Sequence, residues 1–78
     1  MINKDFGSII SSKRKEHRLS QPQLAALMGE RGLDVKAHSI SKWEKNVNLP
    51  NVMQFFALCE ILEITDRERF KFCVNRKN

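Results

Sequence analysis

The chain has 78 residues, 41% of them hydrophobic, and its 14 Lys and Arg outnumber nine Asp and Glu to give a net charge of +5. This length predicts a single domain over residues 1–78, and no apolar run approaches the roughly 18 residues that would cross a bilayer. The amino terminus lacks the pattern of a signal peptide and the positive charge favours a polyanionic partner, so we expect a cytoplasmic protein with no membrane contact.

The first predicted helix runs from about Asn3 or Asp5 to about His17. Phe6, Ile9 and Ile10 recur within it at three- and four-residue spacing, which puts one apolar stripe on the helix surface. Its last turn is basic, as suits the carboxyl end of a helix dipole.

The second predicted helix begins at Gln21 and ends at about Arg31. Ser20, with Gln23 three positions later, forms a capping-box pattern at its start. Gly32 can take the left-handed conformation that ends the helix, with apolar Leu33 beside it.

The third predicted helix starts between Asp34 and Ala37 and runs to Lys45, because Asn46 tolerates the left-handed conformation that stops a helix. We expect Ile40, Trp43 and Val35 to point inward.

Capping residues predict two further helices. Asn51 caps a fourth helix, and Thr65-Asp66-Arg67-Glu68 is a capping box that opens a fifth. The fourth is expected to carry most of the core on a wide apolar face, made of Val52, Phe55, Phe56, Leu58, Cys59 and Leu62. The fifth contains Phe70, Phe72, Cys73 and Val74. The sequence therefore predicts an all-α, compact five-helix bundle.

The third predicted helix has a polar side that could read DNA. Opposite its apolar residues lie Ala37, His38, Ser41 and Lys42. A helix laid in the major groove would present these small, cationic and hydrogen-bonding side chains to base edges. Neighbouring polar residues suit contacts to phosphates, namely Gln21 at the start of the second helix and Lys36, Lys45, Asn46 and Asn48 around the third. An ordinary solvated surface is the alternative for each of them.

No catalytic, metal or cofactor site is predicted. Cys59 and Cys73 lack metal-ligand spacing, and we expect both to be reduced thiols. His17 and His38 have no partner ligands nearby in the sequence. Because no nucleophile stands beside a base in a recognisable pattern, we expect neither enzyme activity nor a small-molecule ligand.

The combined pattern resembles the Cro and phage-repressor type of helix-turn-helix domain, in the xenobiotic-response-element-like family. The matching pieces are Leu19-Ser20-Gln21, Leu24-Ala25, Ile40-Ser41-Lys42-Trp43-Glu44 and Leu49-Pro50, in this order. The resemblance runs from Phe6 to about Thr65 and implies a lambda-repressor-like fold with a helix-turn-helix formed by the second and third helices. It also implies that Arg14 and Glu44 form an ion pair tying the first helix to the end of the third.

The chain departs from this family in its turn. Gly29 stands 11 positions before Ile40, farther than the turn glycine of the family. This spacing indicates a longer second helix that ends at Gly32, followed by a longer connection. Lys36 also stands where the family often has a Ser or Thr cap.

The sequence and the resemblance together predict a sequence-specific double-stranded DNA-binding transcriptional regulator. We expect a repressor that acts as a homodimer with the third helix in the major groove. The fifth predicted helix, with Phe70, Phe72 and Val74, is the expected dimer interface, or else packs on the first helix. Two alternatives stay open: a protein-interaction module or antitoxin on the same scaffold, and the DNA-binding part of a longer repressor whose effector or self-cleaving domain is missing.

Overall fold

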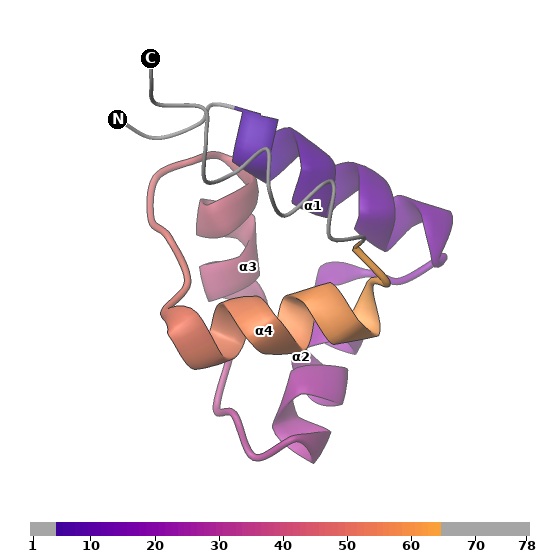
Figure 1. Ribbon diagram of the computed structural model, residues 1–78, viewed down its shortest axis with the longest axis vertical. Coiled ribbons are helices and arrows are strands. Elements are labelled where there is room, and N and C mark those ends of the chain that lie inside the picture. The colour runs from indigo at the N-terminus through magenta and orange to yellow at the C-terminus, as the bar shows by residue number, and fades with distance from the viewer. Residues whose placement is uncertain (1–4, 65–78) are drawn as a thin grey trace.

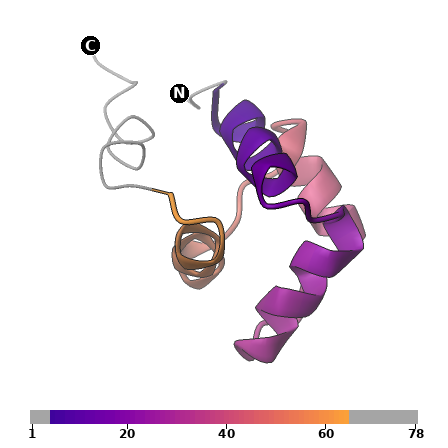
Figure 2. The ribbon, with the colours of Figure 1, turned by 90° about the vertical axis from the view of Figure 1, so that its right-hand side faces the viewer.

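The computed structural model describes residues 5–64, which form four α-helices and no strand (Figure 1). The helices are α1 (Asp5–Glu16), α2 (Gln21–Glu30), α3 (Ala37–Glu44) and α4 (Val52–Ile61). Helix α3 contacts both α1 and α2, and α4 contacts α2. Seen from the side, α1, α2 and α3 lie together while α4, viewed end-on, lies across from them (Figure 2). Within these residues, no helix is long and apolar enough to span a membrane.

The predicted five-helix bundle is wrong in its helix count. Residues 5–64 are all-α but hold four helices, and the fifth predicted helix lies outside the described residues. The capping box at Thr65–Glu68 is a local signal for a helix start, which says nothing about whether a core needs that helix. Here Ile64, at 2% exposure, already joins a core that draws on all four helices.

Two helices begin with complete capping boxes. The Ser20 hydroxyl accepts from the backbone N–H of Gln23 at 3.1 Å, and the Gln23 side-chain oxygen accepts from the Ser20 N–H at 2.8 Å. Asn51 and Gln54 make the same reciprocal pair at the start of α4, both bonds being 2.8 Å long. These contacts satisfy backbone donors that a helix start would otherwise leave without partners. They fix α2 and α4 at the residues that the sequence predicts.

All four helices end in the same way, with one residue in the left-handed conformation. These residues are Arg18, Gly32, Asn46 and Glu63, with φ between 54° and 84°. In each case the next N–H reaches back into the last helical turn, as Leu33 does to the Met28 carbonyl at 3.1 Å. Such Schellman motifs satisfy the last carbonyls of a helix. Gly32 and Asn46 were predicted, whereas Arg18 and Glu63 carry side chains that seldom adopt this conformation.

The core is one cluster between the helices. Its members are Phe6, Ile10, Leu24, Met28, Val35, Ile40, Trp43, Ala57, Leu58, Cys59, Leu62 and Ile64. The inward positions predicted for Val35, Ile40 and Trp43 are therefore correct. The prediction that Val52 and Phe56 belong to the core face is wrong, because they are 66% and 53% exposed. Helix α4 is apolar on more than one side, and only one side can pack inward.

Helices α1 and α3 touch backbone to backbone at Gly7. A Cβ atom at this position would lie 2.2 Å from the Glu44 carbonyl oxygen and 3.0 Å from that of Trp43. The Gly7 N–H donates to Asn46 Oδ1 at 3.1 Å. Because only a residue without a side chain allows this approach, Gly7 sets the distance between α1 and the end of α3.

We predict opposite effects on stability for alanine at two glycines. Gly7→Ala should lower the free energy of unfolding by about 2–3 kcal/mol, because a new methyl group meets backbone that must shift. Gly29→Ala is the matched control: apart from the adjoining backbone of α2 itself, nothing lies within 4 Å of its Cβ position, so better helix propensity should raise stability by up to about 1 kcal/mol. Urea unfolding followed by circular dichroism measures both. A Gly7→Ala protein as stable as the parent chain would contradict the close approach.

Candidate nucleic-acid interface

Helices α2 and α3 are joined by residues 31–36, a connection longer than a tight turn. Val35 is buried in this connection, and Leu33 packs against the core. Two apolar anchors therefore hold the connection on the protein and fix where α3 begins. Arg31 also pairs with Glu60 of α4. The predicted end of the second helix near Arg31 is confirmed, with α2 ending at Glu30 and Gly32 left-handed at φ 84°.

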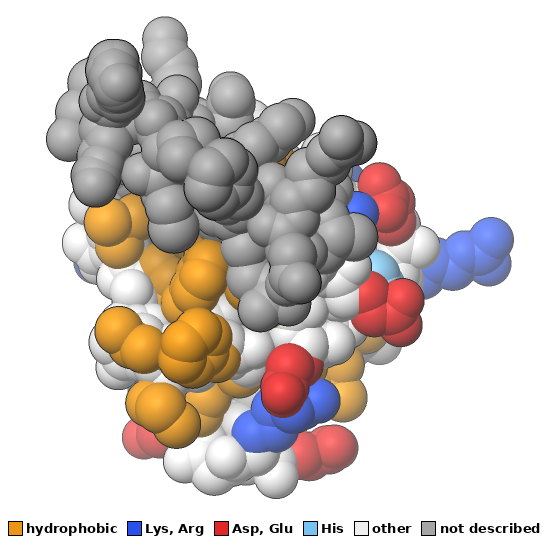
Figure 3. All heavy atoms as spheres, viewed as in Figure 1, with side chains coloured by type: hydrophobic (Ala, Val, Ile, Leu, Met, Phe, Trp, Pro, Cys, Tyr) orange, Lys and Arg blue, Asp and Glu red, His pale blue; other side chains and the backbone are white. Residues whose placement is uncertain are grey.

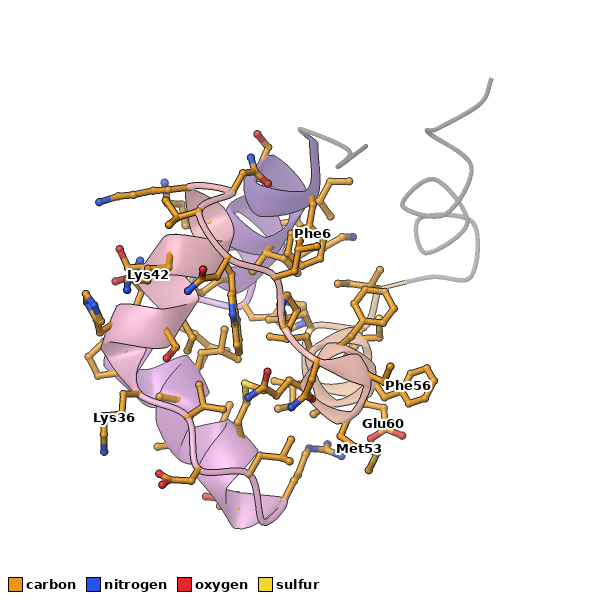
Figure 4. All side chains as sticks on the ribbon, turned by 90° about the vertical axis from the view of Figure 1, so that its left-hand side faces the viewer. Phe6, Lys36, Lys42, Met53, Phe56 and Glu60 are labelled. Atoms are coloured by element: carbon orange, nitrogen blue, oxygen red, sulfur yellow. The ribbon has the colours of Figure 1, made fainter. Side chains whose placement is uncertain are left out.

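The amphipathic helix α3 has one buried side and one outward side. Ile40 and Trp43 point into the core, at 0% and 3% exposure. Four candidate base-contact residues lie elsewhere on the helix: His38 is exposed, and Ala37, Ser41 and Lys42 are half-buried. In Figure 4, Lys42 and Lys36 lie on the side of the molecule away from α4. The outward side of α3 is therefore accessible and carries positive charge.

Residues around α3 extend this surface at both ends. Lys36 is the N-cap, with an exposed side chain that makes no capping hydrogen bond, and Lys45 is the exposed C-cap. Asn48 follows in the loop and is also exposed. Asn46 is half-buried, and its Oδ1 atom accepts the Gly7 N–H, so this side chain helps to join α3 to α1.

One carboxylate joins three helices behind this surface. Arg14 of α1 donates to Glu44 through Nε at 2.6 Å and through Nη2 at 3.1 Å, which is a two-pronged ion pair. Gln21, the first residue of α2, donates its Nε2 to Glu44 Oε1 at 3.0 Å. The third Arg14 bond, from Nη1, goes to the Leu19 carbonyl at 2.8 Å. The network fixes the carboxyl end of α3 relative to both other helices.

The environment of this network favours the charged form of Arg14. The hydrogen bond to Glu44 raises the pKa of Arg14, partial desolvation opposes it, and the attraction of the carboxylate adds to the increase. The side chains of Arg14 and Glu44 are only 11% and 9% exposed. Since Glu44 is the only carboxylate within α3, its pairing with Arg14 leaves no carboxylate of this helix to balance Lys42 or the two capping lysines, Lys36 and Lys45.

The structure brings some of the site residues together and separates others. The network brings together Arg14, Glu44 and Gln21, although the sequence predicts Gln21 only as a phosphate contact. The sequence predicts no role for Gly7, yet this residue determines how closely α1 approaches α3. A lone glycine inside an amphipathic helix is the signal that could have found it, because such a glycine often marks a close approach. Within residues 5–64 no cluster of His, Cys, Asp or Glu is arranged to hold a metal.

Comparison with known proteins gives one match. A sequence model of the helix-turn-helix family, of the Cro/C1 type, matches residues 10–68. The matched region starts at Ile10 in α1 and includes all of α2, α3 and α4. No curated protein and no solved structure matches the chain.

We predict that Glu44→Gln destabilises the fold by about 2–3 kcal/mol. Glutamine cannot neutralise Arg14, whose poorly solvated charge would lose its partner, and the remaining exposure of both side chains limits the cost. Glu60→Gln makes the same chemical change in the exposed pair with Arg31, where the loss should stay below about 0.5 kcal/mol. Urea unfolding compares the two variants. Equal losses would show that the Arg14–Glu44 pair is worth no more than a surface ion pair.

Proposed function

The chain belongs to the Cro/C1-type helix-turn-helix family, and from this premise we propose that it is a transcriptional repressor that binds a pseudo-palindromic DNA site as a homodimer. The family consists of DNA-binding regulators rather than enzymes, which makes this chain a regulator that binds double-stranded DNA. Beyond the family assignment, we propose that the chain represses rather than activates, that it binds as two copies, and that particular residues in and around α3 contact DNA.

One observation carries the proposed way of reading DNA: the outward side of α3 is polar and cationic while its single carboxylate is turned towards Arg14. A helix of this diameter fits the major groove, where base pairs present distinct donors and acceptors. Lys42 would donate to guanine O6 or N7. His38 and Ser41 can each donate or accept, and the Ala37 methyl group would meet a thymine methyl.

The proposed phosphate contacts lie around these base contacts. Lys36 and Lys45 stand at the two ends of α3 with exposed side chains, so they can reach the two walls of a groove. Gln21, Asn46 and Asn48 would add hydrogen bonds to phosphate oxygens. Such contacts release counterions and add affinity at every sequence, whereas the base contacts select a site.

A single helix-turn-helix module reads only a few base pairs, so selecting one site in a genome requires two modules on related half-sites. A homodimer provides them by symmetry, with half-sites about 34 Å apart or a multiple of that. Repression then follows from occlusion, because a dimer seated over a promoter excludes the polymerase. The alternative of a protein-interaction module is less favoured, since the outward side of α3 lacks the large aromatic anchors of a protein interface.

The first test selects the DNA duplexes that the chain binds from a random library. It then measures the affinity of the chain for the selected duplex and for a scrambled duplex at two salt concentrations. The proposal predicts a pseudo-palindrome that binds at least ~10³-fold more tightly than the scrambled control. Weak binding that ignores sequence and disappears with modest added salt would contradict the proposal.

The second test separates base contacts from phosphate contacts with two lysines. Lys42→Ala should cost about 1–3 kcal/mol on the selected site and relax the preference at one base pair. Lys45→Ala should weaken binding to all duplexes alike and reduce the slope of log affinity against log salt by about one unit. Binding is measured by fluorescence anisotropy on selected and scrambled duplexes. Identical behaviour of the two variants on both duplexes would show that the outward face is wrongly assigned.

A further inference from the structure

Five large hydrophobic side chains lie exposed on one side of the molecule. They are Val47, Leu49, Val52, Met53 and Phe56, each between 51% and 66% exposed. They follow one another along the chain, from the loop after α3 into the second turn of α4. Figure 3 shows hydrophobic side chains gathered over this part of the molecule. We refer to these five residues as the α4 patch.

The α4 patch is also free of charge. Residues 46–59 contain no Asp, Glu, Lys or Arg, although 29% of the whole chain is charged. The first charged residue beyond this stretch is Glu60, which pairs with Arg31 at the edge of the patch. An apolar centre with an ionic rim is the usual composition of a protein–protein interface. Residues 46–59 offer no cation to nucleic acid or to an anionic membrane surface, and Arg31 at the edge is already paired with Glu60.

The uncharged, apolar composition of the α4 patch suits a second copy as the partner. Two copies with a net charge of +5 repel one another, so they associate most easily through a surface that brings no charged side chains together. A two-fold interface uses the same patch on both copies, and an uncharged apolar patch is complementary to itself. Each exposed side chain offers on the order of 100 Å², so two patches would bury about 1,000 Å², near the lower limit for a specific interface.

The position of the patch leaves the DNA-binding side of the molecule open. In Figure 4, Met53 and Phe56 point away from the molecule on the side opposite Lys36 and Lys42. A copy seated on Met53 and Phe56 therefore does not cover the outward side of α3. Association and DNA binding use different surfaces and can occur together.

We propose that the α4 patch is the surface through which two copies of this chain associate. This proposal deepens the proposed function, which needs two copies on one DNA site. It can nevertheless be tested without DNA. The limited area makes the pair weak in free solution, with an association that depends on protein concentration.

The experiment measures self-association of the full chain by sedimentation velocity over a concentration series up to ~1 mM, the range of weak complexes. The parent chain should change from monomer to dimer along the series. Phe56→Glu and Met53→Glu should each weaken association at least ~10-fold, because two-fold symmetry places two new charges in one apolar interface. Ser12→Glu adds the same charge at an exposed position of α1 and should leave association unchanged. Circular dichroism and thermal unfolding check that every variant is folded.

A parent chain that stays monomeric throughout the series would overturn the proposal. So would a folded Phe56→Glu and a folded Met53→Glu that dimerise as tightly as the parent. The proposed function is judged separately on a duplex with a single half-site, where Phe56→Glu should bind as well as the charge-matched Ser12→Glu. If the parent chain dimerises through the patch but no duplex is selected, the interface stands and the proposed function fails.

Discussion

Glu44 ends α3 and at the same time accepts hydrogen bonds from Arg14 of α1 and Gln21 of α2. The orientation of α3 relative to α1 and α2 depends on this carboxylate, because a helix of eight residues buries only Ile40 and Trp43 and gains little stability by itself. Gly7 completes the arrangement by letting the backbones of α1 and α3 touch. The geometry of the outward side of α3 is therefore set by contacts on its hidden side.

Much of this fold could be predicted because the deciding signals are local. Ser20, Gly32 and Asn46 act within a few residues of their own position, through capping bonds and left-handed backbone, and the sequence alone identifies all three. The Thr65–Glu68 capping pattern is equally local, which is why it could suggest a fifth helix without showing that a bundle of five forms.

The remaining features depend on contacts between distant residues. Gly7 and Asn46 are 39 positions apart, and no periodic pattern links them. Val52 and Phe56 looked like core residues because α4 is apolar around much of its circumference, and only its packing against the other helices decides which side turns inward. The candidate DNA-contact residues could be proposed from helical spacing, but the role of Gln21 as a partner of Glu44 required the folded arrangement.

The outward side chains of α3 take no part in the Glu44 network or in the contact at Gly7. The residues proposed to contact bases and the residues that hold α3 in place are thus different residues. Ala37, His38, Ser41 and Lys42 belong neither to the core cluster nor to the Glu44 network, whereas Gly7, Arg14 and Glu44 hold α1 against α3. Under the proposed mode of reading DNA, a few substitutions on that side would change the target sequence at a small cost in stability, because none of these side chains is fully buried. The scaffold is therefore well suited to rapid divergence of binding specificity.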